Sequence, residues 1–200
     1  FVTNGRDFQV EKYLEAAEVR AGDSCPKCET PVVIDRAIEI GHIFQLGRKY
    51  AEALDLTVLD QNGKSQVVTM GSYGIGVSRA VAAIAEQTHD EIGLNWPREI
   101  APADIHIVAT GKEAEVFKAA LTLAEDLEEK GLRVMFDDRA DASAGVKFKD
   151  AELIGIPFIV IVGKALSEGK VEFRVRRTGE KTEIELLKAV TEITSRVLNS

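Results

Sequence analysis

Residues 71–79 (GSYGIGVSR) combine three glycines, Gly71, Gly74 and Gly76, with one arginine, Arg79, which are residue types suited to binding phosphate. Glycine lets the backbone approach a ligand closely, and the start of a helix offers free N–H groups to an anion. Arginine adds a permanent planar cation with five donors. A β-branched segment (66–70) precedes this run and an alanine-rich segment (80–85) follows it, so we predict a strand, a glycine-rich turn and a helix. The alternative is a packed strand-to-helix turn with a surface arginine, because short glycine patterns are weak evidence.

A second group of polar and aromatic side chains lies upstream, where a long β-branched run (32–44) predicts a strand. Strand alternation places His42 and Phe44 on one face and Ile43 and Gln45 on the other. His42, Phe44 and Gln45 can therefore line one pocket only if the strand twists or bulges. The alternative for His42 is a hydrogen-bonded histidine of the core.

Cys25 and Cys28 form a single CxxC pattern, and they are the only two cysteines of the chain. A structural zinc site needs about four ligands, and no second CxxC or HxxxH follows. We therefore expect no metal and a loop with two free thiols, with a metal half-site or a disulfide as the alternatives.

The composition is that of an ordinary globular protein, with 45% hydrophobic and 29% charged residues. No apolar run approaches the roughly 20 residues that span a bilayer, and residues 1–7 contain no signal-peptide core. These features and the two cysteines favour a reducing cytoplasm and no membrane partner. The chain begins with Phe1 rather than methionine, so we expect a fragment or a processed piece.

The formal net charge of −8 argues mildly against a nucleic-acid partner, because phosphate binding usually needs a basic face. Basic side chains nevertheless cluster in the second half of the chain, at Arg139, Lys147, Lys149, Arg174, Arg176 and Arg177. Either a basic patch on an acidic protein or ordinary solvated strand edges would produce this distribution.

The first half of the chain predicts antiparallel strands. A short helix is expected at 11–17 and a loop at 22–31, before the strand at 32–44. Strands at 56–59 and 67–70 flank Asn62-Gly63, a strong hairpin signal. A helix at 75–87 follows, and two prolines in 95–102 suggest a domain boundary.

The second half alternates strands and helices. Strands are expected at 105–109, 132–136 and 157–162, with helices at 113–130 and 145–154 between them. A hairpin of strands 171–177 and 181–185 precedes a last helix, 185–198, with Leu187, Val190, Ile193 and Val197 facing inward. We therefore predict an α/β domain with a mixed, mostly parallel sheet covered by helices.

These motifs together, in this order and spacing, resemble the C-terminal part of bacterial-type prolyl-tRNA synthetases, which are class II enzymes. The resemblance rests on residues 35–50 (DRAIEIGHIFQLGRKY), 71–79, 137–139 (DDR) and 152–157 (ELIGIP), and it covers the chain from about Asp35 onward. It implies a tail of the inserted editing region at 1–34, the end of a partial antiparallel class II catalytic sheet at 35–103, and an anticodon-binding domain at 104–200.

The resemblance also assigns roles to the first two groups of residues. Residues 71–79 are similar to class II motif 3, whose arginine contacts ATP, so Arg79 is the expected catalytic residue. Gly71, Gly74, Gly76 and Arg79 would bind ATP, accompanied by Mg²⁺. His42, Phe44, Gln45 and Ser72 would form the proline pocket; Ser72 replaces a cysteine of some family members.

In the second half, the resemblance implies that the domain recognises the guanines of the proline anticodon. Arginine donates to guanine O6 and N7, and a carboxylate accepts from N1 and N2. Unstacked bases can also stack on aromatic rings such as Phe148. The expected anticodon-binding residues are Asp137, Asp138, Arg139, Lys147, Lys149 and Glu152. A strand end followed by a helix cap and a surface salt bridge is the alternative for residues 137–139.

We therefore expect a proline-tRNA ligase, with proline, ATP and tRNA(Pro) as partners and a homodimer as the full-length enzyme. Class II motifs 1 and 2 are not found in this sequence, so the chain alone should not aminoacylate. A non-catalytic tRNA-binding module and a small nucleotide-binding protein are the two alternatives. Retained, salt-sensitive tRNA binding without ATP turnover favours the first, and ATP binding without tRNA preference favours the second.

Overall fold

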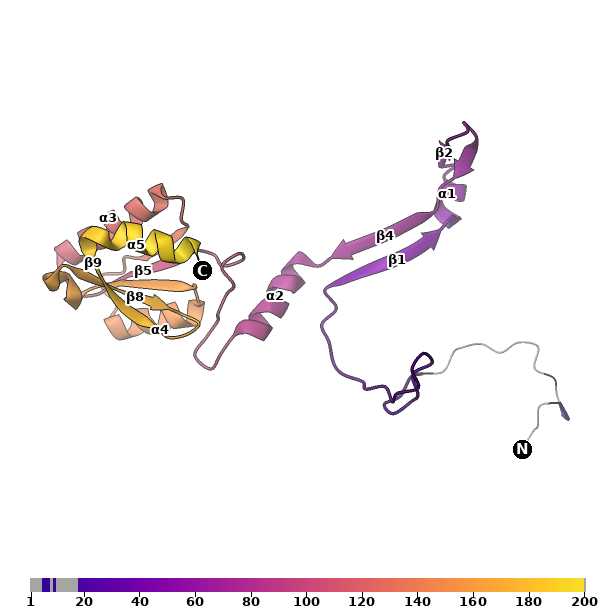
Figure 1. The fold of residues 1–200 in the computed structure, drawn as a ribbon, viewed down its shortest axis with the longest axis horizontal. Coiled ribbons are helices and arrows are strands. Elements are labelled where there is room, and N and C mark those ends of the chain that lie inside the picture. The colour runs from indigo at the N-terminus through magenta and orange to yellow at the C-terminus, as the bar shows by residue number, and fades with distance from the viewer. Residues whose placement is uncertain (1–4, 8, 10–17, 200) are drawn as a thin grey trace. The chain divides into compact units, whose positions relative to one another are not determined.

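The computed structural model describes residues 5–7, 9 and 18–199 of the 200-residue chain (Figure 1). The backbone divides into two units, Phe1–Glu39 and Ile40–Ser200. The helix expected at 11–17 falls outside the described residues. The domain boundaries expected at 34/35 and 103/104 stay predictions.

The first unit contains a closed loop around the two cysteines. The amide of Gly22 donates to Val32 O at 2.9 Å, and that of Cys25 donates to Thr30 O at 2.9 Å. Ser24 and Pro31 form an isolated antiparallel bridge between these two bonds. The loop expected at 22–31 is therefore present and is held by its own backbone.

The strand expected at 32–44 is wrong in its first part. Strand β1 comprises Gly41–Gly47 and pairs antiparallel with β4, Met70–Ile75, beginning at the pair Gly41 and Ile75. Residues 32–40 lie outside any strand. A β-branched sequence forms a strand only where a neighbour pairs its N–H and C=O groups, and β4 extends no further than Ile75.

A short helix and a hairpin connect β1 to β4. Helix α1 comprises Lys49–Ala53, and strands β2 and β3 comprise Thr57–Leu59 and Ser65–Val67. These two strands pair antiparallel, which confirms the hairpin predicted from Asn62-Gly63. The Asp60 carboxylate accepts the amides of Asn62 and Lys64, and Gly63 has a φ of 76°, which favours glycine.

The prediction of a glycine-rich turn at residues 71–76 is wrong. Gly71 and Gly74 lie inside β4, because pairing with β1 continues as far as Ile75. Only Gly76 lies at the strand-to-helix junction, where it caps helix α2, Val77–Thr88, with φ −77° and ψ 92°. Residues 70–75 thus form a pleated strand that leads directly into helix α2.

The second half of the chain forms a five-stranded sheet with the order β6-β5-β7-β8-β9. The strands comprise Ile105–Ala109 (β5), Val134–Asp137 (β6), Phe158–Val162 (β7), Lys170–Val175 (β8) and Lys181–Glu185 (β9). Strand β5 pairs parallel with β6 and β7, whereas β7–β8 and β8–β9 pair antiparallel. The predicted mixed sheet is confirmed, with two parallel and two antiparallel pairings.

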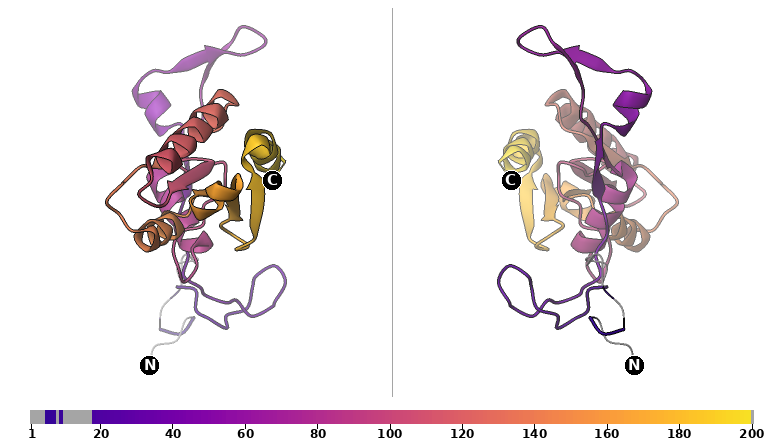
Figure 2. Two further views of the ribbon diagram at one scale, coloured as in Figure 1. Left: turned by 90° about the vertical axis from the view of Figure 1, so that its left-hand side faces the viewer. Right: turned by 90° about the vertical axis from the view of Figure 1, so that its right-hand side faces the viewer.

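Helices cover both faces of this sheet (Figures 1 and 2). Helices α3, Ala114–Glu129, and α5, Leu186–Leu198, pack against the main core, which includes Ile105, Ile107 and Val160. Helix α4, Ala144–Ile154, covers the other face, and a 3-10 helix, η1 (Lys164–Glu168), follows β7.

One residue of the last helix differs from the prediction. Leu187 is 99% exposed, whereas Ala189, Ile193 and Val197 are fully buried. Helix α5 starts at Leu186, and this partly buried neighbour packs against the core in place of Leu187.

The segment before β5 packs against the five-stranded domain. The amide of Leu94 donates to Leu153 O at 3.0 Å, and Trp96 donates from its backbone to Gly155 O and from Nε1 to Ile154 O. Gly155 ends α4 with a φ of 75°, and a Cβ there would lie 2.0 Å from Leu94 O. Glycine is therefore required where this segment crosses the end of α4.

Asp104 is the centre of a buried ion network at the start of the sheet. Its carboxylate is 5% exposed and accepts from Arg98 Nε at 2.8 Å and from the Arg133 side chain and backbone. Burial raises the pKa of Asp104, but the hydrogen bonds from Arg133 and Arg98 outweigh it and lower the pKa to about 2.

We expect the domain to lose stability as the pH falls from about 4 towards 2. An unfolded aspartate has a pKa of about 3.9, so the lowered folded pKa stabilises the native state above that value and this contribution is lost on acidification. Asp104→Asn should flatten this part of the profile of unfolding free energy against pH. Urea unfolding of both proteins between pH 2 and 7 measures it, and parallel profiles would contradict the assignment.

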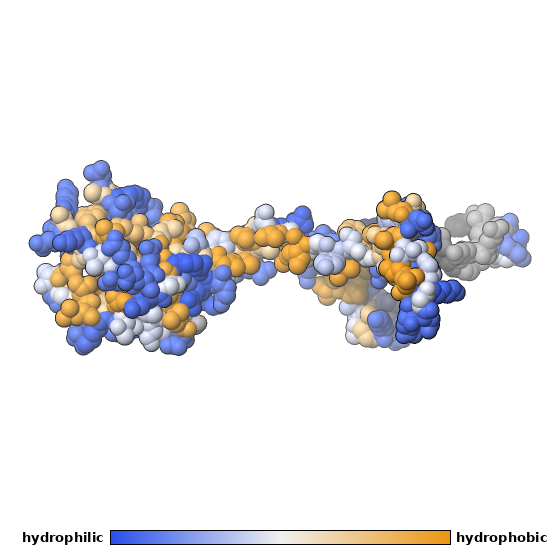
Figure 3. All heavy atoms as spheres, turned by 90° about the horizontal axis from the view of Figure 1, so that it is seen from above, coloured by the Kyte–Doolittle hydropathy of each residue, from blue (hydrophilic) through white to orange (hydrophobic). Residues whose placement is uncertain are grey.

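Large apolar side chains are exposed along β1, β4 and α2. Ile43, Tyr73, Ile75 and Val77 are between 71% and 85% exposed, and apolar surface follows α2 in the middle of Figure 3. Among the described residues, no helix is long and apolar enough to cross a membrane. The exposed faces of this strand pair are therefore apolar surface that the described residues leave uncovered.

Candidate functional site

The strand pair β1–β4 brings together three of the four residues predicted for the proline pocket. His42 lies opposite Gly74, and Phe44 lies opposite Ser72, so these side chains share one face. The His42 and Phe44 rings are 4.0 Å apart between centroids. His42 is exposed among the described residues, none of which encloses it in a core.

Gln45 lies on the opposite face, where it pairs with Gly71. The register shifts between Gln45 and Gly47, whereas the sequence argument required a twist or bulge between Phe44 and Gln45. In this structure the shift comes after Gln45 and leaves the residue on the other face. The described residues thus provide one wall that carries His42, Phe44 and Ser72.

The residues predicted for ATP lie along β4 and at the start of α2. Gly76 precedes the helix without a side-chain cap, so the first amides of α2 are available to an anion. A Cβ at Gly76 would lie 3.2 Å from Arg79 Cβ, so glycine permits this arginine to pack close to the cap. A Cβ at Gly74 would meet nothing within 4 Å, so no contact among the described residues requires glycine there. An uncapped helix start, an adjacent arginine and an open backbone suit a polyphosphate.

The residues predicted for the anticodon gather at the carboxyl end of β6 and on α4. Arg139 donates from Nε and Nη2 to Asp137 at 3.0 and 2.7 Å and from Nη2 to Asp150 at 2.7 Å. The two carboxylates raise the pKa of Arg139. Hydrogen bonds from Arg139 lower the pKa of Asp137 to about 2, against the opposing effect of burial. This guanidinium is thus held rigidly while half of its side chain stays exposed.

Lys147 lies inside the domain instead of on the surface. Its side chain is 1% exposed, and Nζ donates to Ala109 O at 2.7 Å and to Asp137 O at 3.2 Å. The Asp137 carboxylate is 3.5 Å away. Lys147 therefore fixes the ends of β5 and β6, and its buried ammonium offers no surface to a base.

The other predicted anticodon residues surround this network. Asp138 and Lys149 are exposed, and Glu152 is partly buried on α4, where its carbonyl accepts from Arg176 Nε at 3.0 Å. Phe148 carries the Arg174 guanidinium over its ring at 5.0 Å. One face of the ring expected to stack a base is therefore already occupied.

A cavity of about 400 Å³ lies next to the ion pairs of Arg139 with Asp137 and Asp150, between β6, β5 and α4. Its lining includes Asp137, Arg139 and Asp150 at the rim and the apolar Met135 and Leu153. His106 also lines it, although the sequence analysis did not single out this residue. A lone histidine inside an apolar strand was the available signal.

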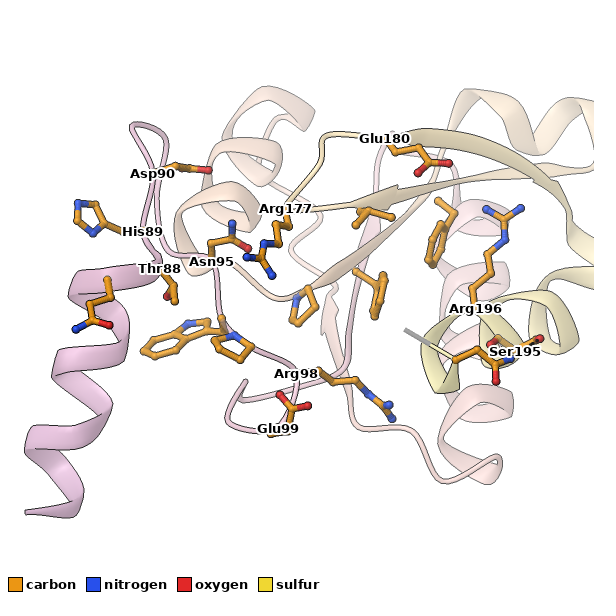
Figure 4. Close-up of a pocket in the computed structure, with 18 residues that line it drawn as sticks. Thr88, His89, Asp90, Asn95, Arg98, Glu99, Arg177, Glu180, Ser195 and Arg196 are labelled. Atoms are coloured by element: carbon orange, nitrogen blue, oxygen red, sulfur yellow. Dashed lines mark hydrogen bonds between the residues drawn. The ribbon is translucent and has the colours of Figure 1, made fainter. Parts of the chain in front are cut away.

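A second cavity, of about 1110 Å³, lies between the segment 87–99 and the β8–β9 hairpin and α5 (Figure 4). Arginines from three elements, Arg98, Arg177 and Arg196, surround it together with Trp96. Arg98 pairs with Asp104 and Arg196 with Glu192. None of the predicted site residues lines this cavity. The only sequence signal for it was the cluster of basic residues Arg174, Arg176 and Arg177.

The two cysteines show no metal site. Cys25 and Cys28 are free thiols, and the described residues contain no group of three or more histidine, cysteine or acidic side chains that could hold a metal ion. The loop expected around the two thiols is present, and the expectation that they bind no metal stays a prediction. Thr30 Oγ1 lies 3.0 Å from Cys28 Sγ, and this side-chain hydrogen bond lowers the pKa of Cys28.

We expect Cys28 to react with iodoacetamide before Cys25. Cys28 is exposed whereas Cys25 is partly buried, and the thiolate is the reactive form. Thr30→Val should slow the alkylation of Cys28 at neutral pH by removing the hydroxyl. Peptide mass spectrometry over time measures both rates, and equal rates for the two cysteines would contradict the prediction.

The chain matches two family models and several curated relatives. Residues 104–196 match the model of an anticodon binding domain, and residues 7–88 match that of the class II tRNA synthetase core domain (G, H, P, S and T). A proline--tRNA ligase of Nocardioides sp. is 61% identical over 90% of this chain and 31% of its own length. The enzyme of the same name from Streptomyces coelicolor is 58% identical over 97% of this chain and 34% of its own length. The chain thus spans about a third of the length of these relatives.

A solved structure shares the fold. A prolyl-tRNA synthetase from Cryptosporidium parvum, complexed with L-proline and AMP, superposes with a TM-score of 0.69. It is 23% identical, and the match covers 80% of this chain and 34% of that one.

Proposed function

Because this chain belongs to the prolyl-tRNA synthetase family of class II aminoacyl-tRNA synthetases, we propose that it is the tRNA-binding part of a proline-tRNA ligase. In this proposal residues 104–200 bind the anticodon of tRNA(Pro). The observation that carries it is the rigid Arg139 guanidinium, held by Asp137 and Asp150 beside a cavity at the carboxyl end of β6.

Each side chain at this edge has a separate task. Arg139 Nη1 donates to neither carboxylate in the hydrogen bonds described above, so it can donate to the O6 or N7 of a guanine. Asp138 and Lys149 are exposed and would contact the base or the phosphates around it. Lys147 acts indirectly, because it holds the backbone of Asp137 in place. Glu152 lies on the same helix and completes the proposed anticodon-binding set.

Residues 35–103 would contribute to proline activation in the full-length enzyme. The amides at the start of α2 and Arg79, beside Gly71, Gly74 and Gly76, would hold ATP, whose polyphosphate brings Mg²⁺. His42, Phe44 and Ser72 would hold the proline ring on one face of β1–β4. Forming an adenylate needs the amino-acid carboxylate aligned with the α-phosphate and its charge neutralised, and Arg79 would supply that charge. Gln45 would join this pocket only through a further twist of β1.

The strand pair β1–β4 is unlike the five-stranded domain in its burial. Its side chains are largely exposed, whereas β5 and β7 are buried along their whole length. We propose that the remaining catalytic sheet of a homodimeric, cytoplasmic enzyme covers these faces, so the chain alone should bind tRNA and not aminoacylate. The second candidate is a non-catalytic tRNA-binding module, because class II motifs 1 and 2 are not found in this sequence.

The test is titration of this chain with a tRNA(Pro) transcript and with a transcript in which the anticodon guanines are changed. We expect tighter binding to the first, and affinity for both should fall as salt rises from 50 to 200 mM. The chain alone should not catalyse ATP–pyrophosphate exchange. If the full-length protein catalyses this exchange, it is a ligase and not a non-catalytic module. Equal affinity for both transcripts at every salt concentration would refute anticodon recognition.

A further inference from the structure

The carboxyl end of helix α4 is capped by a separate segment of the chain, residues 90–96, which we call the strap. A helix leaves its last carbonyl groups without partners inside the helix. At the end of α4 the carbonyls of Leu153, Ile154 and Gly155 all accept hydrogen bonds from the strap. Trp96 donates two of these three bonds, one from its amide and one from Nε1. The strap therefore satisfies carbonyls that would otherwise need water or other side chains.

The carbonyl of Glu152, one residue earlier, is bound by an arginine that also holds the strap. Arg176 directly follows β8, and its side chain is 3% exposed. Its Nε donates to Glu152 O at 3.0 Å, and Nη1 and Nη2 donate to the two carboxylate oxygens of Asp90 at 2.7 and 2.8 Å. Paired, charge-assisted bonds of this kind are strong and fix the geometry of both partners. One buried guanidinium thus joins the last turn of α4 to the first residue of the strap.

Asp90 is also held from within the strap. Its Oδ1 accepts the amides of Ile92 and Gly93 at 3.0 and 3.1 Å. Gly93 lies directly on α4, where a Cβ would come within 2.5 Å of Glu152 O, so glycine is required there. Asp90 itself closely follows α2, which ends at Thr88. The strap is therefore a tight connection between the end of α2 and the end of α4.

Helix α4 connects this cap to Arg139. Asp150 lies on α4 shortly before Glu152, and its Oδ2 accepts from Arg139 Nη2 at 2.7 Å. It is one of the two carboxylates that orient the guanidinium, and the other is that of Asp137. A helix end opens more readily when its carbonyls lack partners, so loss of the cap would loosen the turn that carries Asp150. The guanidinium would then be held by Asp137 alone.

We propose that Asp90 and Arg176 are positioning residues for anticodon recognition, because they fix the last turn of α4 and this turn fixes Arg139 through Asp150. The inference rests on the proposed function and adds to it two residues that do not contact the RNA. Arg176 is buried, and Asp90 carries a charge of the same sign as the phosphates. Since the coupling between two sites is reciprocal, RNA bound at Arg139 also stabilises the strap.

The first test is Asp90→Asn, titrated with the tRNA(Pro) transcript and with the transcript whose anticodon guanines are changed. Asparagine still accepts the amides of the strap but cannot bind the guanidinium through two carboxylate oxygens. The ratio of the affinity for tRNA(Pro) to the affinity for the changed transcript should fall about two- to tenfold, as for other residues that act through their neighbours. Weaker binding to tRNA(Pro) should cause this fall, although the loss of a negative charge by itself favours RNA binding.

Glu91→Gln is the matched control, and Arg176→Lys is a second variant. Glu91 is the exposed neighbour of Asp90, so Glu91→Gln removes the same charge outside the cap and should keep the wild-type ratio. A lysine ammonium cannot replace the planar fork that binds Asp90 and Glu152 O together, so Arg176→Lys should lower the ratio as Asp90→Asn does. Thermal unfolding establishes that each variant is folded before it is titrated.

A double-mutant cycle with Arg139→Ala shows whether the effect passes through Arg139. In the Arg139→Ala background, Asp90→Asn should lower the ratio no further. Hydrogen–deuterium exchange of peptides that cover the strap gives the reciprocal measurement. Saturating tRNA(Pro) should slow exchange of the strap in the wild-type chain and not in Arg139→Ala. A role confined to stability would produce neither result.

The outcomes distinguish the two proposals. If the wild-type chain prefers tRNA(Pro) and folded Asp90→Asn keeps the same preference, the positioning role is refuted and anticodon binding stands. The role is also refuted if Asp90→Asn lowers the ratio equally with and without Arg139, or if tRNA(Pro) leaves exchange of the wild-type strap unchanged. If the wild-type chain shows no preference, both proposals fail. A lower ratio in Asp90→Asn that disappears in the Arg139→Ala background supports the assignment.

Discussion

Replacing Lys147 with alanine is expected to destabilise the five-stranded domain by about 3–5 kcal/mol. The side chain is 1% exposed, and its ammonium bonds the carbonyls of Ala109 and Asp137. Truncation would leave both carbonyls without this donor, and the Asp137 carboxylate would keep only the Arg139 guanidinium as a nearby cation. It would also open a cavity beside Phe117, whose ring lies 5.2 Å from Nζ.

Two companion variants test this account of Lys147. Methionine in Lys147→Met fills the volume of the lysine side chain but supplies no donor. The loss of unfolding free energy should therefore be smaller, about 1–3 kcal/mol. Lys149→Ala removes an exposed lysine of the same helix and should stay within about 0.5 kcal/mol of wild type. Urea unfolding followed by circular dichroism and by the fluorescence of Trp96, the only tryptophan, gives the three values. Similar losses of unfolding free energy for Lys147→Ala and Lys149→Ala would contradict the buried contacts assigned to Lys147.

Replacing Arg139 with alanine is expected to weaken binding of tRNA(Pro) by about tenfold to a hundredfold. A well-placed arginine–guanine contact contributes about 1–3 kcal/mol of discrimination, and the Asp137 and Asp150 carboxylates would then face the RNA without their cation. The ratio of the affinity for tRNA(Pro) to the affinity for the transcript with changed anticodon guanines should fall by a similar factor. The tRNA titration described above measures both quantities.

Arg177→Ala is the matched control for Arg139→Ala. It removes the same charge from the same domain, but at the large cavity beside β8 and β9. We expect it to weaken binding to both transcripts slightly and equally, and only through the salt-dependent electrostatic contribution. If Arg177→Ala reduced the preference more than Arg139→Ala, the recognition site would lie at the large cavity.

The five-stranded domain could be predicted from its sequence because local pattern and burial agree there. Strand β7 is a continuous apolar run and β5 is apolar except for His106, as expected for strands buried on both faces, and both form as predicted. Val116, Ala120 and Leu123 of helix α3 recur at the spacing of one helical face, and all three are buried. The predictions at 32–40 and 71–76 failed because strand ends depend on a pairing partner, which no local pattern reveals.

The candidate site was predictable only in part, for the same reason. The family resemblance, through the DDR motif at the end of β6, pointed to Asp137 and Arg139. The sequence did not reveal that Lys147 points inward, because a lysine on a helix usually faces water. It also did not connect His106 to this edge, because that contact depends on the register between β5 and β6. Both errors concern tertiary packing rather than secondary structure.

Hydrogen–deuterium exchange of the chain with and without tRNA(Pro) tests the central claim most directly. The account predicts protection on tRNA binding in peptides that cover the end of β6 and the start of α4, residues 134–152. Peptides of α5 and of the cysteine loop should exchange equally in both states. Protection confined to the segment 87–99 and the β8–β9 hairpin, with none at 134–152, would contradict anticodon recognition at the carboxyl end of β6.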